Sequence, residues 1–139
     1  MLKSELLHPE ILQALGASGH GSRVLIADGN YPFVTRAYPS AARVYLNFSP
    51  GVLNVTQVLE TLVTAIPVEA AHVMTPDDGS EPSIFADFRR ILPDLDLQKH
   101  DRFTFYDAAR DSDTSLVIAT GEQRIYANIL LVIGVVPPP

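Results

Sequence analysis

The run of residues 129–136, Ile-Leu-Leu-Val-Ile-Gly-Val-Val, constrains the fold of this chain more than any other feature. It is apolar almost throughout, and strands that lack a polar face are usually buried on both sides of a sheet. Short apolar runs at 24–27, 70–74 and 115–120 predict further strands. A loose alternation at 43–48 and a strict one at 102–106 predict two more.

Three stretches between these strands have the apolar spacing and the end signals of helices. The first begins at Pro9, a residue that suits a first helical turn. The second follows Asn54, which has capping-box spacing with the glutamine three residues on, and it ends at Pro67. The third covers 84–92, and residues 94–99 are expected to form a connecting loop. Strands that alternate with helices predict an α/β protein with helices on both faces of a sheet.

The composition narrows the class of protein. A length of 139 residues suits a single domain, 1–139, and 47% hydrophobic residues suffice for a real core. The net charge of −6 disfavours a nucleic-acid partner, and the lack of cysteine excludes disulfides and thiolate zinc sites. Neither a signal peptide nor an apolar run of about 18 residues is present, so a cytoplasmic protein without a membrane span is expected. The mean hydropathy of +0.15 suggests buried subunit contacts.

The most chemically suggestive stretch surrounds His20, which lies between Gly19 and Gly21 just before the first predicted strand. Glycines on both sides let the backbone and a ligand approach closely. Asp28 directly follows the same strand, and ligands of α/β proteins often bind where buried strands end. His20 and Asp28 are therefore candidate functional residues.

Other motifs have simpler interpretations. The glycine-rich segment 16–21 follows a helix and precedes a strand, the reverse of the order in a dinucleotide-binding loop. No Gly-x-Ser-x-Gly elbow is present, and the four histidines lack the close spacing of a zinc site. His8 is expected to begin a helix, His72 to be hydrogen-bonded in the core, and His100 to be exposed to solvent.

Two further segments each have both a structural and a functional interpretation. Tyr126-Ala127-Asn128 precedes the last strand, where a phenol and an amide could recognise sugar hydroxyls or simply begin the strand. Arg102 begins a predicted strand, and its five donors suit a polyol as well as a surface position.

Taken together, these segments resemble the RbsD/FucU family of sugar mutarotases, which includes L-fucose mutarotase and D-ribose pyranase. The resemblance runs over nearly the whole chain. The matching segments, in chain order, are His8–Leu12, Gly19–Gly21, Asp28 with Tyr31-Pro32, Arg102–Tyr106, Thr120–Glu122, Tyr126–Leu131 and Gly134-Val135.

The resemblance implies a three-layer α/β/α sandwich with a mixed, largely buried β-sheet. It implies that His20 is the catalytic proton donor and that a monosaccharide is the substrate. The substrate-binding residues that it implies are Asp28, Arg102, Tyr126, Ala127 and Asn128. It also implies a homo-oligomer, commonly a ring-shaped decamer, with the site near subunit contacts. Mutarotation opens and recloses a cyclic hemiacetal by proton transfer, so no cofactor or metal is expected.

The identity of the sugar stays open at this point. Arg102 and the Phe-Thr-Phe-Tyr that follows resemble the fucose type, whereas Ala127 and residues 51–57 resemble the ribose type. We therefore expect a mutarotase for L-fucose or a related sugar, with D-ribose pyranase as the alternative. Ser22 replaces an acid that the family usually has, and residues 35–48 match poorly. These departures are the basis of a competing hypothesis, a sugar-binding or regulatory protein without catalysis.

Overall fold

The computed structural model describes residues 1–139 and contains four helices and six strands. The helices are short, and none is long and apolar enough to cross a membrane. The elements, in chain order, are α1 (Pro9–Ala17), β1 (Arg23–Ala27), β2 (Ala42–Tyr45), α2 (Val55–Leu62), β3 (Val68–Met74), α3 (Ile84–Ile91), β4 (Leu97–His100), α4 (Arg102–Ala109), β5 (Thr114–Ala119) and β6 (Ile129–Ile133).

The six strands form one mixed sheet in the order β2-β5-β1-β6-β3-β4. Strand β1 is parallel to β5, which is parallel to β2, and β3 is parallel to β4. Only β6 runs the other way, between β1 and β3. The carboxyl ends of five strands therefore meet at one edge of the sheet, together with the amino end of β6.

Two hydrophobic clusters cover the two faces of this sheet. Alternate residues of β1 show the division, because Val24 and Ile26 belong to a cluster of 21 buried residues whereas Leu25 and Ala27 belong to one of 10. The larger cluster takes side chains from α1, α2 and α3, and the smaller one from α4 and the loop after β1.

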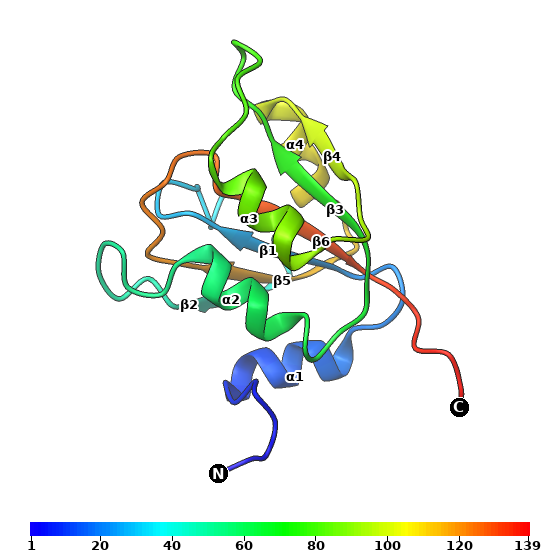
Figure 1. Cartoon of the computed structure of the whole chain (residues 1–139). Coiled ribbons are helices and arrows are strands. Elements are labelled where there is room, and N and C mark those ends of the chain that lie inside the picture. The colour runs from blue at the N-terminus through cyan, green and yellow to red at the C-terminus, as the bar shows by residue number, and fades with distance from the viewer.

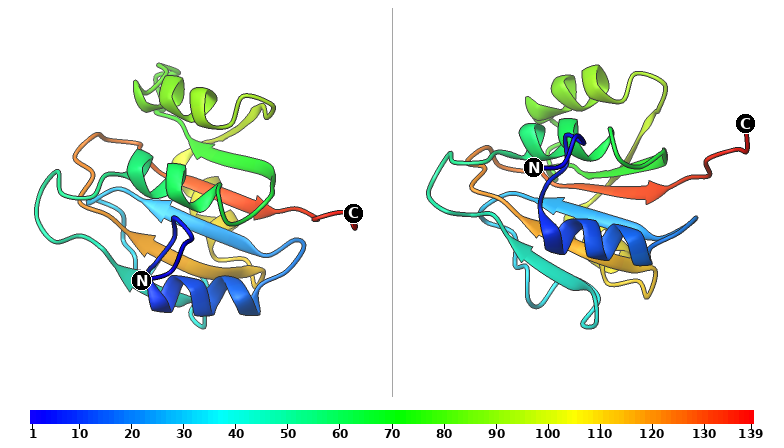
Figure 2. Two further views of the ribbon diagram at one scale, coloured as in Figure 1. Left: turned by 60° about the horizontal axis from the view of Figure 1, so that its bottom comes forward. Right: turned by 90° about the horizontal axis from the view of Figure 1, so that it is seen from below.

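Helices α2 and α3 lie in front of the sheet in Figure 1 and α4 lies behind it. Figure 2 gives two further views of the same layers. The predicted three-layer α/β/α sandwich with a mixed sheet is confirmed.

The predicted strand at 102–106 is wrong, because these residues begin helix α4. The Asp101 side chain caps the helix by accepting hydrogen bonds from the Thr104 backbone N–H and hydroxyl, at 2.8 and 3.0 Å. Phe105 and Ala109, four residues apart, point into the core. The apparent period of two in Arg-Phe-Thr-Phe-Tyr thus reflects an exposed Phe103 rather than a strand face.

The predicted loop at 94–99 is wrong in its second half. Residues Leu97–His100 form β4, the outermost strand of the sheet, which pairs with β3. An edge strand is less constrained by burial, and Gln98 and Lys99 are both exposed. The apolar alternation that marks an inner strand is therefore missing from this segment.

Candidate functional site

The candidate residues Asp28 and Asn128 meet at the edge of the sheet where β1 ends and β6 begins. Because β1 and β6 are antiparallel neighbours, the residue after β1 lies beside the residue before β6. The Asp28 backbone N–H donates to Asn128 Oδ1 at 2.8 Å, and Asn128 Nδ2 donates to Asp28 Oδ2 at 3.2 Å. Two residues 100 positions apart in sequence thus form a reciprocal pair.

The Asp28 carboxylate is almost completely buried, with 3% of the residue exposed. Besides Asn128, it accepts hydrogen bonds from the backbone N–H groups of Asn30 at 3.0 Å and Ala127 at 3.1 Å. Burial raises the pKa of Asp28 above its usual range, and these hydrogen bonds oppose that shift in part. The carboxylate is thus a rigid acceptor that fixes segment 126–128 against the end of β1.

A cavity of about 340 Å³ opens beside this carboxylate. Four of the five predicted substrate-binding residues line it: Asp28, Arg102, Tyr126 and Asn128. The fifth, Ala127, is fully buried behind them and contributes its backbone N–H to Asp28. The remaining lining residues are Asn30, Tyr31, Met74, Tyr106 and Ile125. Helix α4 places Arg102 and Tyr106 on the cavity one turn apart, whereas on the predicted strand they would share a face but lie about 13 Å apart.

His20 lies at the opposite edge of the sheet. It precedes β1, whereas Asp28 follows it, and the five residues of β1 at about 3.3 Å each span about 17 Å. The His20 side chain is 60% exposed. Within one chain, His20 therefore does not meet the residues of the cavity.

The partner of His20 is Glu69, a residue that the sequence analysis missed. Glu69 lies near the amino end of β3, and its carboxylate oxygens are 3.1 and 3.0 Å from His20 Nε2. Gly134 lies against Glu69, and a Cβ at this position would be 3.3 Å from Glu69 Cβ. Ser22 instead accepts a hydrogen bond from the Gly19 backbone N–H at 3.1 Å. His20 thus has an acidic partner, but this partner is Glu69 on β3 and not the residue at position 22.

The other histidines have structural surroundings. His8 caps α1 as predicted, accepting a hydrogen bond from the Ile11 backbone N–H at 3.4 Å. His72 and His100 lie on the paired strands β3 and β4, with Nδ1 of His72 2.8 Å from Nε2 of His100. Burial and the neighbouring His100 lower the pKa of His72. The prediction that His100 is simply exposed is wrong, because it is half-buried in this pair.

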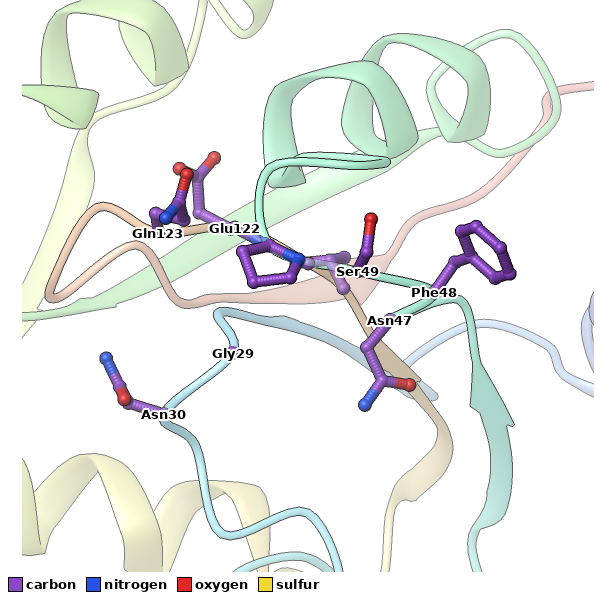
Figure 3. A pocket seen from close by; sticks show the side chains of 10 residues that line it. Gly29, Asn30, Asn47, Phe48, Ser49, Glu122 and Gln123 are labelled. Atoms are coloured by element: carbon purple, nitrogen blue, oxygen red, sulfur yellow. The ribbon is translucent and has the colours of Figure 1, made fainter.

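A second cavity, of about 480 Å³, adjoins the first at Asn30, which lines both. Figure 3 shows it between the loop at 29–30, the turn at 47–50 and the loop at 120–123. None of the predicted catalytic or substrate-binding residues lines it. Four of the five predicted substrate-binding residues therefore line the smaller cavity, whereas the predicted catalytic residue, His20, lines neither.

Comparison with known proteins gives consistent matches over the whole chain. It is 31% identical over 141 residues to the fucose mutarotase of Mus musculus, covering 91% of this chain and 88% of that protein. It is 33% identical over 136 residues to D-ribose pyranase 2 of Streptomyces griseus, covering 97% and 98%. A crystal structure of the fucose mutarotase from Streptococcus pneumoniae in complex with L-fucose superposes with a TM-score of 0.84 at 25% identity, covering 99% of this chain and 100% of that one.

The family model for the RbsD/FucU transport protein family matches residues 1–136. With this match and relatives above 30% identity, the chain belongs to the RbsD/FucU family.

Proposed function

We propose that this protein is a mutarotase that interconverts the cyclic forms of a monosaccharide, most readily L-fucose or a related sugar. The observation that carries the proposal is the buried Asp28 carboxylate, held by Ala127 and Asn128 at the wall of a cavity of about 340 Å³. A cavity of that size, with a few fixed polar groups, suits a small polar ligand. Its relatives include proteins named fucose mutarotase and D-ribose pyranase.

Ring opening requires two proton transfers. A proton reaches the ring oxygen as its bond to the anomeric carbon breaks, and the anomeric hydroxyl loses a proton to give the aldehyde. Closure reverses both transfers on the other face of the carbonyl. In this proposal His20 gives a proton to the ring oxygen and solvent water accepts the proton of the anomeric hydroxyl, since histidine gives and takes protons near neutral pH and the His20 side chain is open to water. Glu69 orients the imidazole through the contact of its carboxylate with His20 Nε2.

The sugar is held by the residues at the other edge. The Arg102 guanidinium supplies donors to its hydroxyls, and the Tyr126 and Tyr106 rings flank the same space. Asp28, with Asn128, fixes the wall against which the sugar lies. Neither the roles of these residues nor that of His20 requires a metal or a cofactor.

Because β1 separates His20 from the cavity, we propose that a complete site forms between two copies of the chain. One copy contributes His20 and Glu69, and its neighbour contributes the cavity that contains Asp28 and Arg102. Such a head-to-tail contact generates a closed ring when its rotation closes. We therefore propose a homo-oligomer, with the ring-shaped decamer implied by the family resemblance as its form and the cytoplasm as its location.

The test of the function is saturation-transfer NMR. One anomer of a sugar is irradiated and the signal of the other is followed, with and without protein, for L-fucose, D-ribose, D-galactose and D-glucose. We expect faster anomer exchange for L-fucose. Exchange between pyranose and furanose forms of D-ribose alone would instead assign the pyranase activity, which Ala127 favours. Sugar binding without faster exchange for any of the four would refute a mutarotase and leave a binding protein.

We expect Glu69→Gln to slow anomer exchange about five- to tenfold, because an amide group replaces one of the two carboxylate oxygens that hold the imidazole in place. The effect is moderate, since both side chains are partly exposed and water screens the pair. Glu60→Gln is the matched control, because Glu60 forms an exposed pair with Arg90 away from His20. Equal rates for the two variants would rule out a role for Glu69.

A further inference from the structure

The loop between β5 and β6 carries an ion-pair network, built on the buried Glu122, that the proposed reaction does not use. Only 5% of Glu122 is exposed. Its Oε1 accepts hydrogen bonds from the backbone N–H and Nε of Arg124, both at 3.0 Å, and its Oε2 accepts from Arg124 Nη2 at 2.9 Å. The Val55 backbone N–H, at the start of α2, donates to the same carboxylate at 3.3 Å.

Arg124 connects this carboxylate to a second one. Its Nη1 donates to Asp87 Oδ2 at 2.8 Å, and Asp87 belongs to α3. Although burial opposes ionisation, the hydrogen bonds from Arg124 hold the pKa of Glu122 below its usual range. The planar guanidinium thus binds two carboxylates through separate nitrogen atoms, a geometry that a lysine ammonium cannot reproduce.

Tyr126 lies two residues beyond Arg124 and has a strained backbone. Its φ is +58°, and only one other non-glycine residue of the chain, Leu53, has a positive φ. A bulky residue adopts this left-handed conformation only when its surroundings determine it from both sides. On the far side, the Ala127 backbone N–H is bound to Asp28. On the near side, Arg124 is bound to Glu122 and Asp87.

Neither Glu122 nor Arg124 lines the cavity that contains Asp28, so neither is placed to touch the sugar. Figure 3 shows the Glu122 side chain pointing away from Asn30, on the side where α2 begins. Any effect of the network on the sugar must therefore pass through the loop. Ile125 and Tyr126, the two residues between the anchors, both line the cavity.

We propose that Arg124, held by Glu122 and Asp87, is a positioning residue that fixes Tyr126 in its left-handed conformation and so shapes the sugar pocket. This inference rests on the proposed function, since the pocket matters only if a sugar occupies it. Arg124 sets the affinity for the sugar. It does not take part in proton transfer, which the proposal assigns to His20 at the other edge of the sheet.

The test uses Arg124→Met, which keeps the length of the side chain and removes its donors. We expect the KM for the sugar to rise about tenfold while kcat stays within about twofold, since binding and not proton transfer is affected. The ¹⁹F resonance of a fluorotyrosine incorporated at position 126 should shift. Arg89→Met is the matched control, because Arg89 also pairs with a carboxylate, Glu81, but touches no part of the loop.

A second variant, Asp87→Asn, guards against a loss of folding. Asp87 is partly exposed, so this change keeps Glu122 paired and loosens the other side of Arg124, together with the exposed pair of Asp87 with Arg90 at 3.8 Å. We expect the same shift in the ¹⁹F signal and a smaller rise in KM. Arg124→Lys should fail to restore KM.

Two results would overturn the inference. One is an unchanged ¹⁹F signal at position 126 in both Arg124→Met and Asp87→Asn. The other is a KM within twofold of the parent in folded Arg124→Met. A different result, the absence of anomer exchange in the parent protein, would refute the proposed function. In that case the ¹⁹F signal still reports whether the network sets the conformation of Tyr126.

Discussion

His20→Ala is expected to lose the enzymatic part of anomer exchange, a fall of about a hundred- to ten-thousand-fold, which is the contribution of a positioned proton donor. The fold should survive, because the His20 side chain is exposed and its one partner is the exposed Glu69. Saturation-transfer NMR gives the exchange rate, and urea unfolding of the same sample gives the stability.

His8→Ala is the control for this variant. His8 lies at the start of α1, pairs with neither His20 nor Glu69, and does not line the cavity that contains Asp28. It should retain the parent exchange rate. If His20→Ala retained even half of the parent rate, the proton donor would have to be another residue.

The same variant tests whether the site forms between two copies. His20→Ala and Arg102→Ala, each inactive alone, are mixed after denaturation and refolded together. If one copy supplies His20 and its neighbour supplies Arg102, one intact pairing in four restores about a quarter of the parent rate. A mixture as inactive as its components would show that both residues must come from the same chain.

Gly121→Ala is expected to have the largest effect on stability. A Cβ at this position would lie 2.5 Å from the Val52 carbonyl oxygen and closer still to that of Ser49. The turn cannot move away easily, because the Gly121 N–H donates to Leu53 O at 2.9 Å and its carbonyl accepts from Gly51 N at 2.7 Å. Overpacking against backbone should therefore lower the free energy of unfolding by about 3 kcal/mol.

Gly16→Ala is the matched control for the same substitution. Apart from its chain neighbours and the backbone of its own helix, α1, no atom lies within 4 Å of a Cβ at Gly16. Alanine there should raise the free energy of unfolding by about 0.5–1 kcal/mol. Urea denaturation at one protein concentration compares the two variants. A Gly121→Ala protein as stable as the parent would mean that the 49–53 turn yields without cost.

The sequence was most informative where local pattern and burial agree. The apolar runs that became β1 and β6 predicted buried strands, and the position of Asp28 after β1 predicted its place at a sheet edge. The contact between Asp28 and Asn128 needed the antiparallel pairing of β1 with β6, which no local pattern carries. Asn128 was identified as a candidate site residue by the family resemblance and not by its distance from Asp28 in the sequence.

The wrong predictions at 102–106 and 94–99 have a common cause. In both, the presence or absence of a strand was inferred only from whether apolar and polar residues alternate. Alternation at 102–106 suggested a strand, although Asp101 followed by Thr104 is a helix-start signal that could have corrected it. The absence of alternation at 97–100 suggested a loop, although edge strands need none.

Glu69 was missed because nothing in the sequence links it to His20, 49 positions earlier. The available signal was weak, a single acid near the start of an otherwise apolar strand. Its importance follows from the sheet, which brings the amino ends of β1 and β3 to one edge on either side of β6.

The separation of His20 from Asp28 by the length of β1 has a consequence for how such a protein can diversify. On the proposed roles, substitutions around Arg102 and Tyr126 can change which sugar is accepted without disturbing the His20–Glu69 pair of the same chain, because neither His20 nor Glu69 lines the cavity. A lineage with this architecture can acquire new substrates by mutation at one edge while inheriting its acid–base chemistry intact from the other. Residues that specify the sugar should accordingly vary more freely among paralogues than those that move the proton.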